Sequence, residues 1–150
     1  MSLTVPPPII GIFYGFLIWL GARWFPELSV TFPGQSAFAG ILGLIGATMD
    51  ATSVLAFIKA RTTISPLSPS NTKKFVRTGF YRISRNPMYL GMALLLSAYG
   101  VWLGSFILVP VLCLFVWYLT TFQIKPEEIE LRRKFGEGYD QYCSAVRRWI

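Results

Sequence analysis

Four long apolar segments dominate the sequence and leave few architectures open to it. They run over about residues 9–25, 36–58, 88–103 and 105–124. A helix needs about 20 apolar residues to cross a bilayer. A soluble domain of 150 residues could not bury an apolar content of 53%. We therefore expect an all-α, polytopic membrane protein with four transmembrane helices, folded as a single domain over residues 1–150.

The basic residues gather in two of the connections between these segments. One group lies between the second and third segments, and the other follows the fourth; they are Lys59, Arg61, Lys73, Lys74, Arg77, Arg82 and Arg85, then Lys125, Arg132, Arg133, Lys134, Arg147 and Arg148. Four crossings put both groups on one side, which the positive-inside rule makes cytoplasmic. We therefore expect both termini in the cytoplasm. The net charge of +7 then orients the chain and does not indicate nucleic-acid binding.

The cysteine and histidine content excludes several kinds of chemistry. The chain has no histidine, so a Ser-His or Cys-His relay and a His-based metal site are excluded. Cys113 and Cys143 lie far apart without a CxxC spacing, which indicates neither a zinc site nor a disulfide framework. We expect no metal.

Small residues recur at a spacing of four in the first two segments. Gly11 and Gly15 lie in the first, and the second carries the series Ala39, Gly43, Ala47 and Ala51. Such series let helices approach closely in lipid. We expect the first two helices to contact each other.

Asp50 stands well inside the second apolar segment. A carboxylate within a membrane is costly and is a functional candidate. Two alternatives stay open. Asp50 takes part in function, or it joins helices through hydrogen bonds with Thr48, Thr52 or Ser53.

The connection before the third helix contains a polar stretch and then a basic, aromatic one. Residues 61–70 predict an extended loop, and Lys73 and Lys74 a contact with anionic lipid. Pro87 suits the first turn of a helix, with Asn86 as an N-cap whose side chain accepts a backbone N–H. The exposed N–H groups of such a helix start favour an anion, such as a carboxylate.

A second charged stretch follows the fourth helix, where Pro126 predicts a new helix start and cytoplasmic helices over about 126–148. Glu128 has Arg132 at i+4, and Glu130 has Lys134 at i+4. Glu127 has no basic partner at that spacing and lies close to the membrane. It is therefore the better candidate for binding a cationic group, with Glu128 second.

Beyond these acids, Gly136 and Gly138 predict a helix break. A helix lying on the membrane surface follows from the spacing of Tyr139, Tyr142 and Val146. Residues 147–149 are interpreted as an interfacial anchor.

These motifs resemble the signature of the isoprenylcysteine carboxyl methyltransferase and phospholipid methyltransferase superfamily. The resemblance covers roughly residues 60–150. It rests on Gly79-Phe80-Tyr81, Arg85-Asn86-Pro87-Met88-Tyr89-Leu90-Gly91, Gln123-Ile124-Lys125-Pro126-Glu127-Glu128, Leu131, Phe135-Gly136, Tyr139, Tyr142 and Arg148-Trp149-Ile150. The chain departs from the family pattern at Asn86, where many members have histidine. A hydrogen-bonding role survives there, because an amide can both donate and accept.

The resemblance implies an integral membrane enzyme that uses S-adenosylmethionine and releases S-adenosylhomocysteine. Arg85 and Glu127 are the implied catalytic residues. The implied cofactor-binding residues are Tyr81, Asn86, Pro87, Tyr89, Leu90, Gly91, Gln123, Glu127 and Glu128. In this assignment a glutamate pairs with the cofactor's ammonium, and the start of the third helix, with Arg85 or Arg82, holds its carboxylate.

The implied reaction is methyl transfer to a lipid or prenylated amphiphile in the membrane. An amine must be unprotonated to attack, and no clear base stands out for it in the sequence. A carboxylate acceptor, as in isoprenylcysteine carboxyl methylation, is therefore favoured, and phospholipid N-methylation is the alternative. An alternative function outside the enzymes is that of a small membrane transporter that uses Asp50. It would explain Asp50 but not the two cytoplasmic motifs.

Overall fold

The structure is a computed structural model that describes residues 5–60 and 77–150. The described part is helical, with one isolated bridge between Ser29 and Ser105 as its only β pairing. The loop expected over residues 61–70, and the lipid contact expected of Lys73 and Lys74, lie outside the described residues. The all-α fold class is confirmed.

The helices follow the apolar segments closely. They are α1 (Pro7–Trp24), α2 (Gln35–Ala60), α3 (Pro87–Leu103), α4 (Leu108–Leu119), α5 (Lys125–Phe135) and α6 (Glu137–Ala145), with short 3₁₀ turns η1 (Pro26–Leu28) and η3 (Gly79–Arg82). Two helical stretches, Gln35–Ala56 and Leu108–Phe135, are long and apolar enough to cross a membrane, and α3 is a shorter apolar helix.

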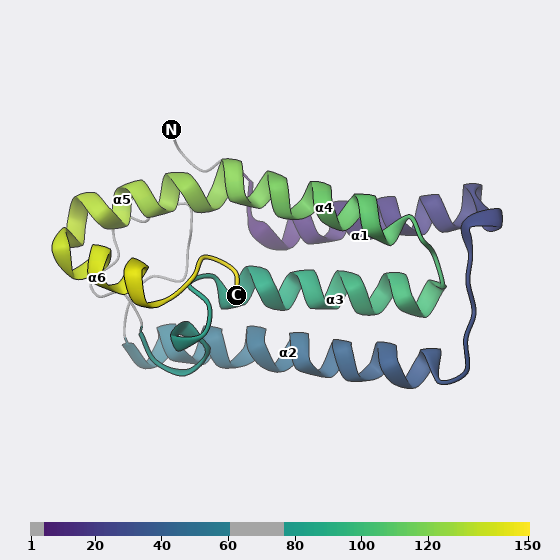
Figure 1. Cartoon of the computed structure of the whole chain (residues 1–150), viewed down its shortest axis with the longest axis horizontal. Coiled ribbons are helices and arrows are strands. Elements are labelled where there is room, and N and C mark those ends of the chain that lie inside the picture. Colours follow the sequence, from purple (N-terminus) through teal and green to yellow (C-terminus); the bar gives the residue numbers. More distant parts are fainter. Residues whose placement is uncertain (1–4, 61–76) are drawn as a thin grey trace.

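Helix α3 lies in the middle of the bundle, between α2 and the pair formed by α1 and α4 (Figure 1). The small residues of α1 face it, whereas the series expected on α2 is divided: Ala39 is buried and Gly43 lies against Ala98 of α3, but Ala47 and Ala51 are exposed. A Cβ on Gly11 or Gly15 would meet Met92 or Leu96 of α3, and a Cβ on Gly46 would meet the backbone of α3. The expected pairing of the first two helices is therefore corrected, because both approach α3 instead, and α2 comes closest at Gly46, which is not a member of the expected series.

One long helix runs from α4 into α5 without a break (Figure 1). The helix start expected at Pro126 is therefore wrong. Proline has no N–H, and its ring crowds the carbonyl four residues earlier. The helix accommodates Pro126 by widening into a π-helical segment, η4 (Thr120–Ile124), where the N–H of Lys125 donates to the carbonyl of Thr120. Such π segments are rare in proteins, and those that occur are often found at functional sites.

One end of the bundle is closed by backbone hydrogen bonds, and we call it the turn end (residues 28–35 and 101–107). Gly104 takes a left-handed conformation with φ of 67°, as expected of a tight break between α3 and α4. The N–H of Val30 donates to the carbonyl of Gly104 at 2.7 Å, and the N–H of Phe106 donates to that of Leu28 at 3.0 Å. The side-chain amide of Gln35 donates to the carbonyl of Val101 at 2.7 Å.

Helix α6 folds back at Gly136, which has φ of 52°. This break was predicted. The apolar side of α6 does not lie free for a membrane surface, because Tyr139, Tyr142 and Val146 are buried and pack with Leu131 and Phe135 of α5. The surface helix expected from their spacing is therefore corrected to a short helix packed on α5.

Candidate functional site

The end of the bundle where α3 begins gathers the residues expected to act, and we call it the site end (residues 50–53, 81–91 and 123–128). Tyr89 lies in the first turn of α3 and Glu127 in the first turn of α5. The hydroxyl of Tyr89, which is 6% exposed, donates a long hydrogen bond of 3.5 Å to Oε2 of Glu127. The two sequence motifs therefore meet through these side chains.

Tyr81 belongs to the same group of side chains. It lies in η3 with 7% exposure, and its backbone carbonyl accepts a hydrogen bond of 2.6 Å from the hydroxyl of Tyr142. Burial and the nearby negative charge of Glu127 raise the pKa of Tyr81 above its ordinary value. The phenol therefore stays protonated and can donate a hydrogen bond.

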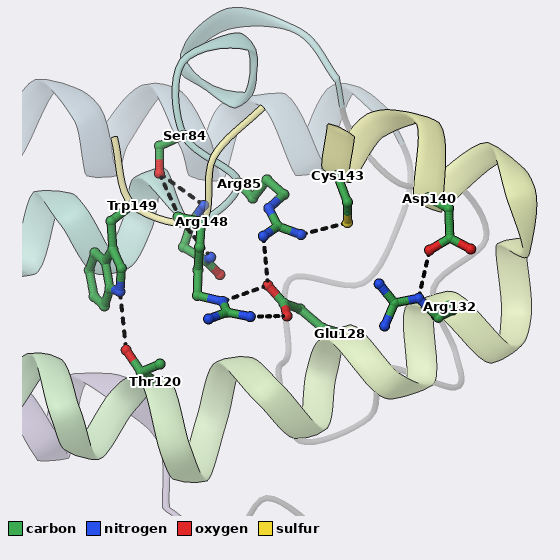
Figure 2. Close-up of polar contacts among 10 residues, drawn as sticks. Ser84, Arg85, Thr120, Glu128, Arg132, Asp140, Cys143, Arg148 and Trp149 are labelled. Carbon is green, nitrogen blue, oxygen red and sulfur yellow. Dashed lines mark hydrogen bonds and ion pairs between the residues drawn. The ribbon is translucent and has the colours of Figure 1, made fainter. Parts of the chain in front are cut away.

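The neighbouring glutamate has a different role. Glu128 is buried between two arginines (Figure 2). Its carboxylate accepts hydrogen bonds from Nε and Nη2 of Arg148 at 2.9 Å and 2.8 Å, and Nη2 of Arg85 lies 3.3 Å from Oε1. The expected i+4 pairing is corrected, since Arg132 bonds to Asp140 at 2.6 Å. Both oxygens of Glu128 are thus engaged, which leaves Glu127 as the glutamate with acceptor capacity to spare.

Arg85 is also engaged within the protein. Besides Glu128, its Nη1 donates to Sγ of Cys143 on α6 (Figure 2). Its side chain is 11% exposed. Arg85 therefore holds α6 and α5 to the start of α3. Arg82, the other arginine named for the cofactor carboxylate, is exposed.

Helix α3 begins at the expected residues, but the N-cap hydrogen bond expected of Asn86 is not formed. Asn86 is the N-cap residue and Pro87 the first helical residue, yet no side chain caps the helix. Nδ2 of Asn86 donates instead to the carbonyl of Arg148 at 2.9 Å. The N–H of Arg85 donates to the carbonyl of Arg147 at 3.0 Å. The C-terminal residues therefore run along the start of α3.

The sequence interpretation missed this role of the C-terminus. Trp149 packs against the main apolar core, and its indole N–H donates to Oγ1 of Thr120 at 3.1 Å (Figure 2). Together with Arg148, it ties the end of the chain to the π-helical segment and to α5. The interfacial anchor expected over residues 147–149 is corrected for these two side chains.

Gln123 lies within the π-helical segment and is 2% exposed. Its Nε2 donates to the carbonyl of Val5 at 3.0 Å. Its Oε1 is buried and has no hydrogen-bond partner in the described part of the chain. A buried acceptor without a partner is unusual in a folded protein and points to a missing donor. Leu90, also expected at the site, is half-buried on α3.

Two cavities reach this group of side chains. An apolar cavity of about 790 Å³ lies between α1, α2 and α3, and both Tyr89 and Asp50 line it. A cavity of about 410 Å³ lies between α2 and η3, and both Ser53 and Tyr81 line it. Tyr89 contacts Glu127, and Tyr81 is within electrostatic reach of it. The tyrosines thus link the two cavities to one carboxylate.

Asp50 lies against Gly91, so closely that a Cβ at Gly91 would overlap its Oδ1. This oxygen is buried, and no described residue hydrogen-bonds to it. The hydroxyls of Thr48 and Thr52 bond to backbone carbonyls of their own helix. Of the two alternatives for Asp50, the one in which it hydrogen-bonds to these threonines therefore finds no support in the structure.

Residues 5–60 and 77–150 contain no group of three or more Cys, Asp or Glu side chains placed to hold a metal ion. The polar side chains at the site end suit an organic ligand with a cationic group and hydrogen-bond donors.

Comparison with known proteins identifies the family. The phospholipid methyltransferase family model, PEMT, matches residues 35–138. The chain belongs to the phospholipid methyltransferase family. The resemblance seen in the sequence motifs is thus confirmed, and with the two long apolar helices it indicates a membrane methyltransferase.

The chain is similar to a protein of Haemophilus influenzae (strain ATCC 51907 / DSM 11121 / KW20 / Rd) described as "Uncharacterized protein". It is 40% identical over 63 residues, which are 42% of this chain and 100% of the relative. No solved structure matches the chain.

The family match extends from α2 to the beginning of α6, so it includes Asp50, Tyr81, Tyr89 and the two glutamates. It leaves out α1 and the C-terminal residues that pair with Glu128. The phospholipid methyltransferase match therefore covers the lining of the smaller cavity and the α2 and α3 walls of the apolar one, whereas the α1 wall and the tether of Arg148 lie beyond it.

Proposed function

We propose that the protein binds S-adenosylmethionine at the site end and transfers its methyl group to an amphiphile in the membrane, releasing S-adenosylhomocysteine. The observation that carries this proposal is the contact between Tyr89 and Glu127. It brings the two motifs of a methyltransferase family to one point, beside an apolar cavity.

The residues present fit such a cofactor. Glu127 has one long hydrogen bond, from Tyr89, and so can accept from an ammonium group. Oε1 of Gln123 is a buried acceptor in need of a donor. Tyr81 and Tyr89 offer aromatic faces to a sulfonium or an adenine. Further proposed contacts come from the start of α3, at Asn86, Pro87, Leu90 and Gly91.

Two of the residues first named for this site support it from behind. Glu128 pairs with Arg85 and with Arg148, and so holds α3 and α5 in register. We propose that Arg85 acts through this network and that Arg82 is the more accessible arginine for the cofactor's carboxylate.

The bound cofactor supplies a methyl group that is already activated by its sulfonium. The protein then has to align the acceptor with that methyl carbon and exclude water. Such alignment contributes about 7–11 kcal/mol where the geometry is good. The buried side chains of Tyr81 and Tyr89, each of which lines one of the two cavities, are placed to do this.

We propose four crossings, with both termini and the site end in the cytoplasm. The charges support this orientation. Lys59, Arg77, Arg82 and Arg85 flank α2 and α3 at the site end. The opposite end carries only Arg23 and Glu27 between residues 23 and 35 and no charge between 104 and 107.

The acceptor is an amphiphile that enters the apolar cavity from the lipid. The sequence favours a carboxylate, as in isoprenylcysteine carboxyl methylation. The family description favours a phospholipid amine. Transport through Asp50 would leave the Tyr89–Glu127 contact and the family match without a purpose.

Calorimetry on the detergent-solubilised protein tests the cofactor site. We expect S-adenosylmethionine and S-adenosylhomocysteine to bind, and Glu127→Gln to weaken binding by about 10-fold or more, since a hydrogen bond to a charged group contributes about 1.5–3 kcal/mol. The matched control is Glu130→Gln, because Glu130 pairs with Arg133 at 2.8 Å on the exposed side of α5. That control should bind within about twofold of the unchanged protein. Absence of binding, or equal losses in both variants, would contradict the proposal.

A further inference from the structure

We propose that Asp50 is the acceptor-site residue, and that it binds the amine of an amphiphile and takes a proton from it before methyl transfer. This inference rests on the proposed function and deepens it by naming the acceptor class and the missing base.

The first step is the position of Asp50 in the bundle. Asp50 faces α3 at Gly91, which lies four residues after Pro87 and so about 6 Å into that helix. A cationic headgroup can therefore reach Asp50 from the membrane surface, while the chain attached to it stays in the apolar region.

The second step is the lack of any internal partner. No described residue hydrogen-bonds to or forms an ion pair with Asp50, and its Oδ1 is buried. A carboxylate in apolar surroundings without a partner costs several kcal/mol. The absence of side-chain bulk at Gly91 keeps the space for this carboxylate. Both features indicate that the partner of Asp50 is a ligand.

The third step is the cavity that Asp50 lines. It measures about 790 Å³, and its walls are mostly apolar side chains of α1, α2 and α3, among them Ile12, Met92 and Leu96. The volume lies within the range of about 300–1,000 Å³ that is usual for ligand sites. One carboxylate in an apolar cavity is complementary to one cationic group on an apolar chain.

The fourth step is the link to the methyl donor. Tyr89 lines the same cavity as Asp50 and contacts Glu127 at the proposed cofactor site. An amine held by Asp50 would therefore face the methyl group past the hydroxyl of Tyr89. A carboxylate acceptor in the same place would be repelled by Asp50, which reverses the preference drawn from the sequence.

The chemistry balances without a further reagent. The ammonium group of the acceptor gives one proton to Asp50 and becomes a neutral amine. The lone pair of its nitrogen then forms the bond to the methyl carbon while the bond between that carbon and sulfur breaks. Both electrons of the broken bond stay on sulfur, which becomes a neutral thioether. The methylated amine carries the positive charge, and Asp50 passes its proton to solvent when the product leaves.

Two sources could supply this chemistry, an ethanolamine phospholipid and a single-chain amine. The shared feature is a primary amine on an apolar chain. Transfer of labelled methyl groups from S-adenosylmethionine distinguishes the sources, using dioleoylphosphatidylethanolamine in nanodiscs, octadecylamine in detergent, and N-acetyl-farnesylcysteine as the carboxylate. We expect at least one amine to be methylated and the carboxylate to be left unmodified.

Asp50→Asn tests the residue itself, since the amide keeps the shape beside Gly91 and loses the charge. We expect turnover of the amine to fall by about 100-fold or more, as for loss of a general base, with the Kd for S-adenosylmethionine within about twofold. The matched control is Thr48→Val, whose hydroxyl bonds to its own helix at 2.7 Å on an exposed face. That control should keep the turnover of the unchanged protein.

The pH dependence separates a base from a binding group. Among the described residues that face Asp50, α1 contributes no titratable group, α3 contributes Tyr89 and Tyr99, and η3 contributes Tyr81. We expect the residual turnover of Asp50→Asn to rise by about 10-fold per pH unit below the pKa of the free amine, a steeper rise than that of the unchanged protein. Equal slopes would overturn the role as a base.

Retention of octadecylamine, followed by native mass spectrometry, tests Asp50 without the cofactor. We expect the unchanged protein to retain the amine at least about 10-fold better than Asp50→Asn, as for loss of a charge-assisted contact. If retention differs in this way but S-adenosylmethionine does not bind, the proposed function fails and the amine site stands. If the cofactor binds but Asp50→Asn keeps full turnover, or if the carboxylate is methylated as fast as the amine, the role of Asp50 is overturned.

Discussion

The two ends of the bundle treat their buried polar groups in opposite ways. At the turn end, the connection between α1 and α2 pairs with the turn between α3 and α4 through backbone hydrogen bonds of 2.7 Å and 3.0 Å. At the site end, several buried side-chain atoms have no partner within the described residues. These atoms are Asp50 Oδ1, Ser53 Oγ, Arg85 Nε and Gln123 Oε1.

This difference indicates that the turn end has a structural role and the site end a functional one. Buried polar atoms are nearly always hydrogen-bonded, because leaving one unsatisfied costs about 1–3 kcal/mol. The turn end follows that rule and serves to close the helices. The site end departs from it, and two of the four residues, Asp50 and Ser53, line a cavity. Proteins break such local rules at functional sites.

The two adjacent glutamates give the sharpest form of this comparison. We expect Glu128→Gln to lower the free energy of unfolding by about 3–5 kcal/mol, because it leaves the buried guanidinium of Arg85 without its counter-charge. Glu127→Gln should cost about 1 kcal/mol or less, since a single long hydrogen bond is affected. Reversible unfolding in detergent, followed by circular dichroism, measures both.

One result would contradict this prediction. Similar losses of stability in the two variants would mean that Glu127 also serves to hold the helices together. Arg133→Ala is the control for a charge removed from α5, because the Arg133–Glu130 pair is exposed, and it should change the free energy of unfolding by less than about 1 kcal/mol.

The contact between α2 and α3 offers a second way to test the site end. A Cβ at Gly91 would overlap Oδ1 of Asp50 and lie 2.9 Å from the carbonyl of Gly46. We expect Gly91→Ala to lower the free energy of unfolding by about 1–3 kcal/mol through overpacking. Gly40→Ala on α2 is the matched control, since nothing lies within 4 Å of a Cβ there. Stability equal to that of Gly40→Ala would show that α3 can shift away from α2 without cost.

Much of the fold follows from local features of the sequence. The apolar segments place the long helices of the bundle, and Gly104 and Gly136 mark the turns because both take a positive φ. Pro126 misled the sequence interpretation. The rule that proline begins a helix is local, whereas the π-helical segment before Pro126 is stabilised by contacts from elsewhere, including the hydrogen bond from Trp149 to Thr120.

The sequence predicted which residues lie at the site better than it predicted which residues they pair with. The motifs named Tyr89 and Glu127, which meet. Helical spacing gave Glu128 a neighbour on its own helix, but its partners are Arg85 and Arg148, which come from other parts of the chain. Spacing along one helix cannot foresee such pairs, because they depend on how the helices pack.

A small effect on stability is expected at the turn end. Nε2 of Gln35 donates to the carbonyls of Val101 and Trp102 at 2.7 Å and 3.2 Å, so Gln35→Ala should lower the free energy of unfolding by about 1 kcal/mol. Binding of S-adenosylmethionine should stay within about twofold, since the turn end and the site end share no polar contact among the described residues. Gln123→Ala removes the same kind of side chain at the site end, where Oε1 of Gln123 has no hydrogen-bond partner among the described residues. It should weaken the binding of S-adenosylmethionine more than Gln35→Ala does. If instead the two variants weaken binding equally, the two ends are coupled through α3, and the separation of a structural end from a functional one is wrong.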